Sequence, residues 1–342
     1  MSVFVSGATG FIAQHIVGQL LDQNYKVIGS ARSQAKIDDL QKKFGNNPNL
    51  SMVIVPDISK LDAFDEAFKT HGKEIKYVLH TASPFTFNVT DFEKDLLIPA
   101  RNGTLGILEA IKKYAADTVE RFVITSSFAA VFDLNNLTNE NVTFTEESWN
   151  PDTWESCQRD GGSAYCGSKK IAEEAAWKFY NENKEHLKFK MAAINPVYVF
   201  GPQRFDADVT KTLNTSCEFI NDALHSTSDK LPQPFSGGYI DVRDVAKAHL
   251  YAFQNENTIG QRLILSEGKF STQDILNYLN ADFPVLKGTI PVGKPEEGIE
   301  HSTAGAKTDN HKTKEILGFE FIGLKQTIDD TAAQILKQEG RL

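Results

Sequence analysis

The chain has 342 residues, of which 41% are hydrophobic and 24% charged, as is typical of a globular protein with one large core or two modest ones. Its 36 Lys and Arg against 45 Asp and Glu leave a net charge of −9, which disfavours nucleic acids and anionic membranes as partners. Met1 leads directly into a short apolar segment with no basic leader, so we expect a cytoplasmic protein without a membrane segment. The three cysteines, Cys157, Cys166 and Cys217, have no C-x-x-C spacing and predict reduced thiols with no metal site.

Short β-rich segments alternate with segments of helical periodicity over the first 195 residues. The predicted strands are Val3–Ser6, Lys26–Ser30, Met52–Val55, Tyr77–His80, Arg121–Thr125 and Phe189–Ile194. Several of them are apolar throughout, as expected for parallel strands that are covered on both faces. The alternation predicts an α/β fold with a doubly wound parallel sheet of the Rossmann type.

After Pro196 the sequence becomes polar and rich in turns, which predicts a smaller, mostly helical domain over the carboxyl edge of the sheet. The apolar periodicity of Val242 to Gln254 predicts a helix that returns to the sheet. We therefore predict a sheet domain of residues 1–195, to which residues 239–256 return. The smaller domain would comprise residues 196–238 and 257–342.

A glycine-rich loop follows the first predicted strand and leads into an amphipathic helix. Its residues are Gly7, Ala8, Thr9, Gly10, Phe11 and Ile12. Gly7 suits a tight turn, Gly10 lets the backbone approach a pyrophosphate, and the small Ala13 lets the helix pack closely on the strand. The N–H groups at the start of that helix would face the anion. The loop therefore predicts that the sheet domain binds a dinucleotide.

The end of the second strand indicates which dinucleotide is bound. A ribose with free hydroxyls is usually held by an acidic residue there, but this sequence has Arg32 and Lys36 and no acidic residue before Asp38. The guanidinium of Arg32 can form two hydrogen bonds with a phosphate, and Lys36 can add a second positive charge. We therefore predict NADPH and NADP+ as the cofactor pair, with the 2′-phosphate at these two cations.

The next two strand ends are predicted to contact the same cofactor. Asp57 can accept a hydrogen bond from the adenine amino group while Ile58 packs against the adenine ring. The fourth strand is followed by three small residues that would lie along the centre of the cofactor, namely Thr81, Ala82 and Ser83.

Tyr165 and Lys169 are four residues apart in a predicted helix and so share one face of it. The preceding strand ends near Ser127, which places a hydroxyl at the same edge of the sheet. A second pair with this spacing, Tyr180 and Lys184, falls late in the same helix, and we interpret it as a surface feature.

These residues suit the reduction of a carbonyl group, whose oxygen gains negative charge as hydride is added. Tyr165 would donate the proton, and Lys169 would lower the pKa of Tyr165 and hold the nicotinamide ribose. Ser127 would donate a hydrogen bond to the carbonyl oxygen. Ser127, Tyr165 and Lys169 are therefore the predicted catalytic residues.

The chain resembles the extended short-chain dehydrogenases/reductases, and within them the dihydroflavonol-reductase-like branch. The resemblance rests on the glycine loop and on the segments 57–59, 80–84, 125–127, 165–169, 195–202 and 239–246. It implies that Pro196 and Val199 flank the nicotinamide, that Ser216 reaches the cofactor, and that two copies of the chain associate through the fourth and fifth helices. Many members carry an asparagine where this chain has Ala100, so a four-residue proton relay is not expected here.

The side chains expected around the substrate are aromatic and have no cation among them: Phe85, Phe128, Phe132 and Tyr198, beside Ser127 and Tyr165. Such a lining suits small apolar aldehydes, α-dicarbonyls and ketones, so we predict an NADPH-dependent carbonyl reductase. A nucleotide-sugar epimerase or dehydratase is one alternative, but it would need clustered cations, and Arg204, Lys211, Arg243 and Arg262 are scattered in the sequence. A non-catalytic NADP(H)-binding sensor is the other alternative, and it would not need Tyr165 and Lys169.

Overall fold

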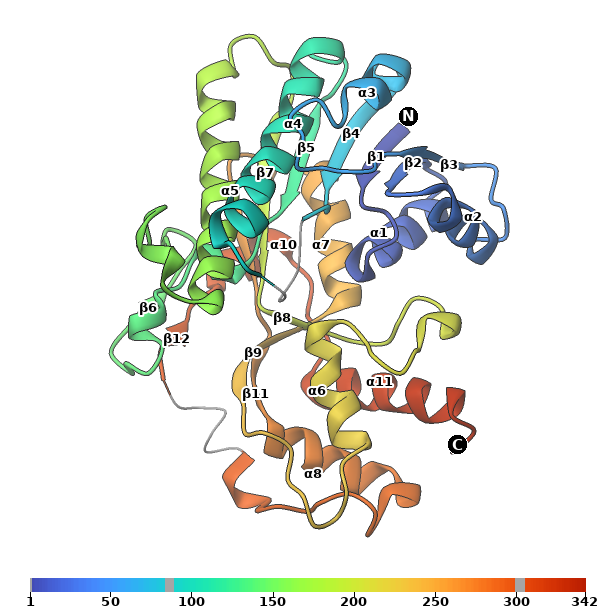
Figure 1. Ribbon diagram of the computed structural model, residues 1–342, viewed down its shortest axis with the longest axis vertical. Coiled ribbons are helices and arrows are strands. Elements are labelled where there is room, and N and C mark those ends of the chain that lie inside the picture. The colour runs from blue at the N-terminus through green and yellow to red at the C-terminus, as the bar shows by residue number, and fades with distance from the viewer. Residues whose placement is uncertain (1, 84–88, 299–304) are drawn as a thin grey trace.

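The structure, a computed structural model, describes residues 2–83, 89–298 and 305–342 of the chain. It has two lobes, of which the upper one is built on a large sheet and the lower one on a small sheet with helices (Figure 1). Within the described residues, no helix is both long enough and apolar enough to cross a lipid bilayer.

The upper lobe contains seven parallel strands, so the predicted doubly wound sheet is confirmed. Their spatial order is β3 (Leu50–Ile54), β2 (Lys26–Ala31), β1 (Ser2–Ser6), β4 (Ile75–His80), β5 (Arg121–Thr125), β7 (Lys190–Pro196) and β10 (Arg262–Leu265). The chain order reverses between β1 and β4, which is where ligands bind in open sheets of this kind.

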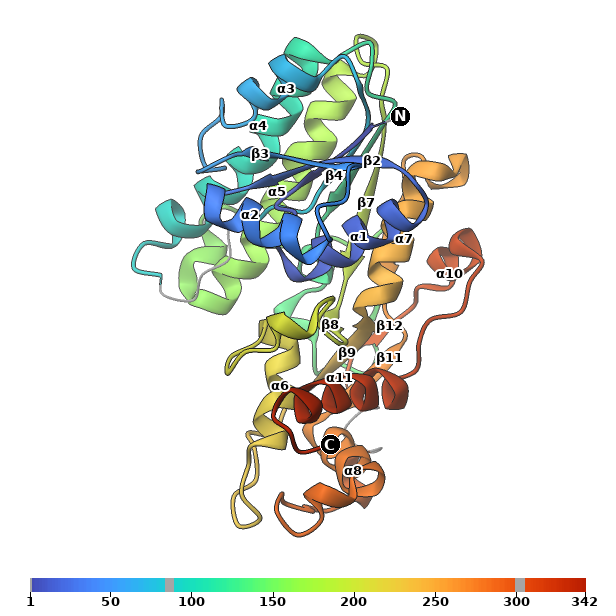
Figure 2. The same cartoon turned by 90° about the vertical axis from the view of Figure 1, so that its right-hand side faces the viewer.

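Helices cover both faces of this sheet (Figure 2). One face carries α1 (Phe11–Asp22), α2 (Gln34–Lys43), α7 (Val242–Gln254) and α10 (His311–Leu317). The other face carries α3 (Asp65–His71), α4 (Ile98–Tyr114) and α5 (Gly161–Asn183). In β1, Val3 and Val5 pack with the first group and Phe4 with the second, which explains why this strand is apolar throughout.

The seventh strand, β10, was not predicted from the sequence. We expected residues 257–342 to lie in the smaller domain, but β10 pairs with β7 in the large sheet, with Arg262 opposite Ala193. This strand is Arg262 followed by three apolar residues, which is too short a segment for periodicity to identify as a sheet strand. Conversely, Tyr239 to Asp241, which we assigned to the sheet domain, lie in β9 of the small sheet.

The lower lobe has a three-stranded sheet of β8 (Tyr198–Phe200), β9 (Ser236–Asp241) and β11 (Gly268–Ser271). Its helices are α6 (Thr215–Leu224), α8 (Thr272–Asp282) and α11 (Leu324–Gln338), which share one apolar core with that sheet. A short parallel pair, β6 (Thr143–Phe144) with β12 (Lys307–Thr308), lies beside the upper lobe. Single helical turns span Glu93–Leu97, Phe128–Ala130, Leu134–Asn136, Ser156–Arg159, Asp206–Asp208, Glu256–Thr258 and Pro284–Leu286.

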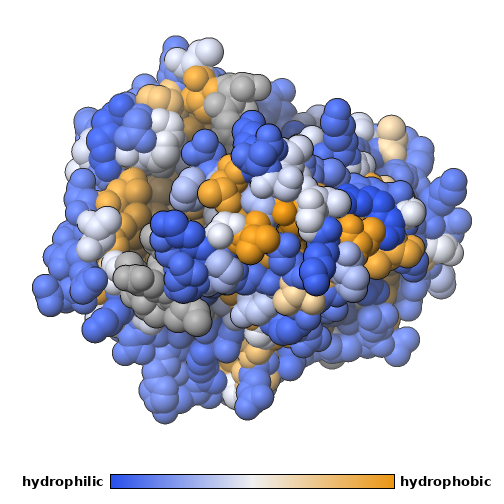
Figure 3. Space-filling view, turned by 90° about the horizontal axis from the view of Figure 1, so that it is seen from below, coloured by the Kyte–Doolittle hydropathy of each residue, from blue (hydrophilic) through white to orange (hydrophobic). Residues whose placement is uncertain are grey.

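Seen from below, the lower end of the molecule shows small apolar patches separated by hydrophilic residues (Figure 3). Exposed apolar residues that occur in this way are normal for a protein surface.

Candidate active site

Gly7 makes the turn between β1 and α1. Its φ of +64° is left-handed, and a Cβ atom there would lie 3.0 Å from the Cα and Cβ atoms of Ala82. The N–H of Gly10 donates to the carbonyl of Gly7 at 2.9 Å, which closes the turn. Gly10 is the N-cap of α1 and has no side chain that could accept from the first N–H groups of the helix, so these groups are available to an anion. The loop therefore fits the pyrophosphate of a dinucleotide.

Most of the other loop residues are partly exposed, so a bound cofactor could contact them. Ala8 is buried, whereas Thr9, Gly10, Phe11 and Ile12 each keep part of their surface exposed. Ala13 is 1% exposed and allows the helix to approach the sheet.

Arg32 follows β2 directly, and Lys36 lies four residues later in the first turn of α2. Both are exposed. Among the residues that the structure describes, neither side chain has an ion pair or a side-chain hydrogen bond, so both charges are available to a phosphate.

Asp57 and Ile58 follow β3 at the same edge. The hydroxyl and the N–H of Ser59 donate to Oδ1 of Asp57 at 2.6 and 2.9 Å, and these bonds, with the nearby charge of Arg32, hold the pKa of Asp57 below its usual value. Ile58 is half-buried against α4, where a Cβ atom at Gly103 would lie 3.4 Å from its Cδ1 atom.

A buried hydrogen-bond network shapes the segment after β4. Oγ of Ser6 accepts from the N–H groups of Thr81 and Ala82, both at 3.0 Å, so its own hydrogen is left for Nδ1 of His80 at 2.8 Å. His80 is therefore neutral, and burial, with the nearby charge of Lys169, lowers its pKa to about 3. Ser6 and His80 could not be assigned to the site from the sequence, because they act through hydrogen bonds between separate strands.

The three predicted catalytic residues lie together at the carboxyl edge of the sheet. The side chains of Ser127 and Tyr165 are hydrogen-bonded to each other. Nζ of Lys169 donates to Oγ of Ser83 at 2.6 Å and lies 5.6 Å from the ring centre of Tyr165. Ser127 follows β5 directly, and Tyr165 and Lys169 lie in the first turns of α5, so two elements converge on one point.

The pKa of Tyr165 is shifted upward, which is opposite to the predicted direction. Burial raises the pKa of Tyr165 to about 12, although its bond with Ser127 acts in the opposite direction. Burial also lowers the pKa of Lys169 to about 8. Desolvation disfavours both charged forms, so the expected lowering of the pKa of Tyr165 by Lys169 is not present in the protein without its cofactor. Tyr165 holds its proton at neutral pH, as an acid must.

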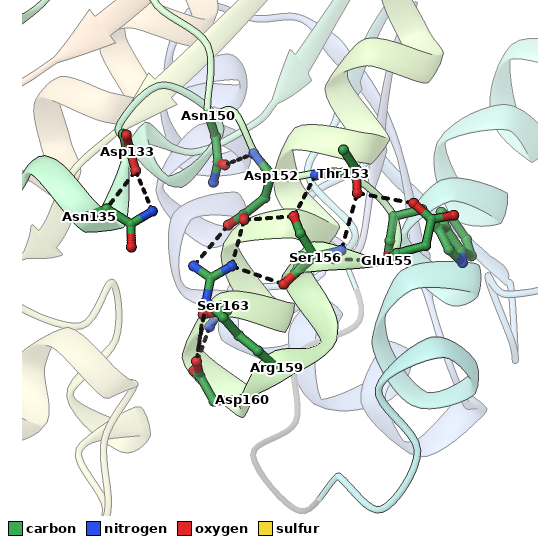
Figure 4. A network of polar contacts seen from close by, with 12 residues as sticks. Asp133, Asn135, Asn150, Asp152, Thr153, Glu155, Ser156, Arg159, Asp160 and Ser163 are labelled. Carbon is green, nitrogen blue, oxygen red and sulfur yellow. Dashed lines mark hydrogen bonds and ion pairs between the residues drawn. The ribbon is translucent and has the colours of Figure 1, made fainter.

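A polar network fixes the start of α5. Oδ1 of Asp160 caps the helix by accepting from the N–H of Ser163 at 2.9 Å (Figure 4). The preceding turn is held by Arg159, which donates to Asp152 at 2.6 Å, and by Ser156, which donates to Asp152 at 2.9 Å (Figure 4). The position of Tyr165 thus depends on the segment immediately before its helix.

Cys157 in that segment lies so close to α5 that a Cβ atom at Gly167 would be 2.5 Å from its sulfur. All three cysteines are free and buried. The described residues contain no group of three or more His, Cys, Asp or Glu side chains that could bind a metal ion.

The predicted substrate-lining residues fall into two groups. Phe128 and Phe132 are half-buried and pack against each other, 5.5 Å between ring centres, and against Phe144. Tyr198 is 37% exposed and stands on an aromatic cluster of the lower lobe, 5.2 Å from Phe235. The fourth predicted residue, Phe85, lies outside the described residues.

Of the residues assigned through the family resemblance, Pro196 ends a strand of the large sheet, whereas Val199 and Ser216 lie in the lower lobe. Pro196 is buried at the end of β7, Val199 is 8% exposed in β8, and Ser216 is half-buried in the first turn of α6. Ala100 is buried in α4, and its methyl group cannot transfer a proton. A cavity of about 10 Å³, the space of about one water molecule, lies nearby between Ser83, Thr104, Ser126, Lys169 and Glu173.

Tyr180 is not a surface residue, contrary to our prediction. It is 9% exposed and stacks on Phe189 at 5.7 Å between ring centres. Only Lys184 of that second pair is exposed. The spacing alone did not reveal that position 180 faces the core of the upper lobe.

The scattered cations do not form a diphosphate site. Arg243 is paired with Asp241 and Asp330, and Arg262 with Glu173. Arg204 lies against α1, where it would contact a Cβ atom at Gly18. The epimerase alternative therefore gains no support from these residues.

Comparison with known proteins agrees with this geometry. Residues 3–265 match the NAD dependent epimerase/dehydratase family. The chain is 67% identical to the NADPH-dependent methylglyoxal reductase of Saccharomyces cerevisiae over the full length of both. Its structure matches that of yeast methylglyoxal/isovaleraldehyde reductase Gre2 complexed with NADPH, with a TM-score of 0.98 and 65% identity over all of both chains. Gre2 of Candida albicans in complex with NADPH matches with a TM-score of 0.95 and 46% identity over 99% of both chains.

Proposed function

Because this chain belongs to the NAD-dependent epimerase/dehydratase family of extended short-chain dehydrogenases/reductases, we propose that it is an NADPH-dependent carbonyl reductase. It reduces small apolar aldehydes, α-dicarbonyls and ketones to alcohols. The observation that carries this proposal is the hydrogen bond between Ser127 and Tyr165, with Lys169 one helical turn further along α5.

The cofactor is held by groups that the described structure leaves available. The N–H groups at the start of α1 would hold the pyrophosphate, and Arg32 with Lys36 would hold the 2′-phosphate. Asp57 and Ile58 would contact the adenine, and Thr81, Ala82 and Ser83 would border the centre of the cofactor. When bound, NADPH supplies the hydride that reduces the carbonyl carbon.

Three side chains act on the carbonyl oxygen and on the ribose. Ser127 donates a hydrogen bond that stabilises the negative charge on the oxygen. Tyr165 gives its phenolic proton to that oxygen, and its raised pKa keeps this proton in place until charge develops there. Lys169 holds the nicotinamide ribose and favours the tyrosinate that remains after proton transfer.

The pocket is closed by apolar and aromatic groups from both lobes. Phe128 and Phe132 come from the segment after β5, and Tyr198 from β8. Pro196, Val199 and Ser216 border the nicotinamide end of the cofactor. A lining of this kind favours small substrates without charge, such as methylglyoxal and 3-methylbutanal.

A panel of carbonyl compounds tests the proposal. The oxidation of NADPH should be followed at saturating methylglyoxal, 3-methylbutanal and an apolar ketone, with NADH in parallel. We expect turnover with NADPH to exceed turnover with NADH by at least tenfold at low cofactor concentration. Equal rates with the two cofactors, or no consumption of any carbonyl, would contradict the proposal, and conversion of a UDP-sugar would favour the epimerase alternative.

The chain forms a homodimer through α4 and α5, which lie side by side on one face of the sheet (Figure 1). This part of the proposal rests on the family resemblance. Light scattering should give about twice the 38.0 kDa of the chain, and a mass equal to one chain would exclude the dimer. A fluorescent fusion is expected to distribute evenly through the cytoplasm.

A further inference from the structure

Glu173 is a fully buried carboxylate one helical turn beyond Lys169 in α5. A buried charge of this kind is strongly destabilising unless it is paired and hydrogen-bonded. Its Oε2 atom accepts from Oγ of Ser126 at 2.6 Å and from Nδ2 of Asn195 at 2.7 Å. Its Oε1 atom accepts from Nε of Arg262 at 2.6 Å and from Nε1 of Trp177 at 3.1 Å. Nη2 of Arg262 also donates to Oε2 at 3.4 Å, so Arg262 contacts both oxygens, whereas Ser126, Asn195 and Trp177 each contact one.

Two of the side chains that donate to Oε2, Ser126 and Asn195, connect Glu173 to the active-site residue Ser127. Ser126 is adjacent to Ser127 in the chain, and Nδ2 of Asn195 also donates to the carbonyl of Ser127 at 3.1 Å. The backbone of Ser127 is therefore held on two sides by groups that Glu173 orients. Since Tyr165 lies in the same helix as Glu173, the contacts form a closed path from Tyr165 through Ser127 back to α5.

The donors on Oε1 anchor the carboxylate. Arg262 is 8% exposed, its guanidinium lies 3.8 Å from the ring centre of Trp149, and it donates to the carbonyls of Glu146 and Ser148. The positive charge of Arg262 balances that of Glu173, so the field of this carboxylate at the reacting atoms is small. The effect of Glu173 on the site is therefore one of geometry.

We propose that Glu173 is a positioning residue that sets the hydroxyl of Ser127 against the hydroxyl of Tyr165. This inference rests on the proposed reductase function. A displacement of about 1 Å between reacting groups can reduce turnover by about a hundredfold, so a fixed distance between these hydroxyls matters for the rate. The binding of NADPH to the glycine loop and to Arg32 does not involve this network.

The test uses Glu173→Gln, with Glu174→Gln as the matched control. Glutamine has nearly the same shape, but an NH2 group that cannot accept a hydrogen bond replaces one carboxylate oxygen, so the donors on that oxygen lose their acceptor. The neighbouring Glu174 is paired with Lys170 at 2.9 Å on the outside of the same helix. We expect kcat of Glu173→Gln to fall by roughly tenfold to a hundredfold with an unchanged Kd for NADPH. The shape of its pH profile should not change, and Glu174→Gln should stay within twofold of the wild type.

Ser126→Ala provides a second variant, because it removes one donor and leaves the carboxylate paired with Arg262. We expect kcat of this variant to fall several-fold. If Glu173→Gln does not fold, the kcat of Ser126→Ala tests whether the network positions Ser127. A value of kcat within twofold of the wild type for both variants would overturn the proposal, as would a Kd for NADPH that rises in parallel with the loss of kcat.

A crystal structure of the variant distinguishes this inference from the proposed function. The hydroxyl of Ser127 is expected to move away from Tyr165 in Glu173→Gln or, if only that variant folds, in Ser126→Ala. An unchanged contact would overturn the inference whatever reaction the wild type catalyses. Failure of the wild type to reduce any carbonyl would contradict the proposed function alone.

Discussion

Nζ of Lys169 lies 2.6 Å from Oγ of Ser83 and 5.6 Å from the ring centre of Tyr165, so one buried amine joins the end of β4 to the catalytic helix. The loop after β4 and the start of α5 are 86 residues apart in the chain. Their contact places the proposed proton donor beside the proposed path of the cofactor.

Replacement of Tyr165 by phenylalanine removes the proposed acid without changing the size of the side chain. Turnover of 3-methylbutanal with NADPH is expected to fall by about 10²–10⁴-fold. The Kd for NADPH, measured by fluorescence titration, should change by less than threefold. Tyr180→Phe is the control, because it alters the tyrosine of the second pair with this spacing, and it should keep turnover within twofold. Substantial activity of Tyr165→Phe would exclude this mechanism.

The affinity for NADPH should depend on pH through Lys169. Burial lowers its pKa to about 8, so the side chain is mainly an ammonium at pH 7 and mainly a neutral amine at pH 9. An anionic cofactor favours the ammonium, so Kd is expected to rise with pH above 8, by at most about tenfold per pH unit. Fluorescence titrations between pH 7.5 and 9.5 measure this slope. The Lys169→Met variant should show no such dependence of Kd on pH. An equal slope in the variant and the wild type would contradict the assignment of this dependence to Lys169.

Arg32→Ala tests the proposed site of the 2′-phosphate. Loss of a charge-assisted hydrogen bond costs about 1.5–3 kcal/mol, so KM for NADPH should rise by roughly tenfold to a hundredfold. KM for NADH should change little, since NADH lacks the phosphate. Lys42→Ala removes an exposed cation from the far end of α2 and serves as control. An unchanged ratio of the two KM values in Arg32→Ala would place the phosphate elsewhere.

His80 should make the protein less stable in acid. Its pKa is about 3 in the folded protein and about 6.5 in an unfolded chain, so below pH 6.5 the unfolded chain binds a proton that the folded protein does not. The free energy of unfolding contributed by this group is therefore complete above pH 6.5 and is lost as the pH falls toward 3. At pH 5 the loss is about 2 kcal/mol.

Urea unfolding at pH 7 and pH 5 measures this loss. His80→Asn keeps an acceptor for the hydroxyl of Ser6 but cannot bind the proton, so the difference between the two pH values should shrink by about 2 kcal/mol. Part of the dependence should remain, because burial also lowers the pKa of His15 and of His249 to about 4. The exposed His186 provides the control, since His186→Asn should leave the dependence as it is in the wild type.

The fold could be predicted in large part because its signals are local. The glycine turn at Gly7, the apolar strands and the i, i+4 pair of Tyr165 and Lys169 each depend on residues close together in the chain. The carboxyl ends of parallel strands share one edge of the sheet, so groups such as Ser83 and Ser127 could be assigned to one site without coordinates.

Burial and long-range pairing could not be predicted in the same way. Tyr180 has the same spacing to Lys184 as Tyr165 has to Lys169, yet its ring is in the core. Glu173 and Arg262 are 89 residues apart and pair only because β10 joins the large sheet, which the sequence did not indicate.

The sequence by itself therefore determined the class of fold, the dinucleotide loop and the residues of the proposed reaction, since these follow from spacing and from the chemistry of each side chain. The tertiary structure alone decided which polar groups are buried together, because desolvation and hydrogen bonding depend on neighbours from distant segments. It is this burial that makes His80 neutral, keeps the proton on Tyr165 and joins Glu173 to Ser127 through Ser126 and Asn195.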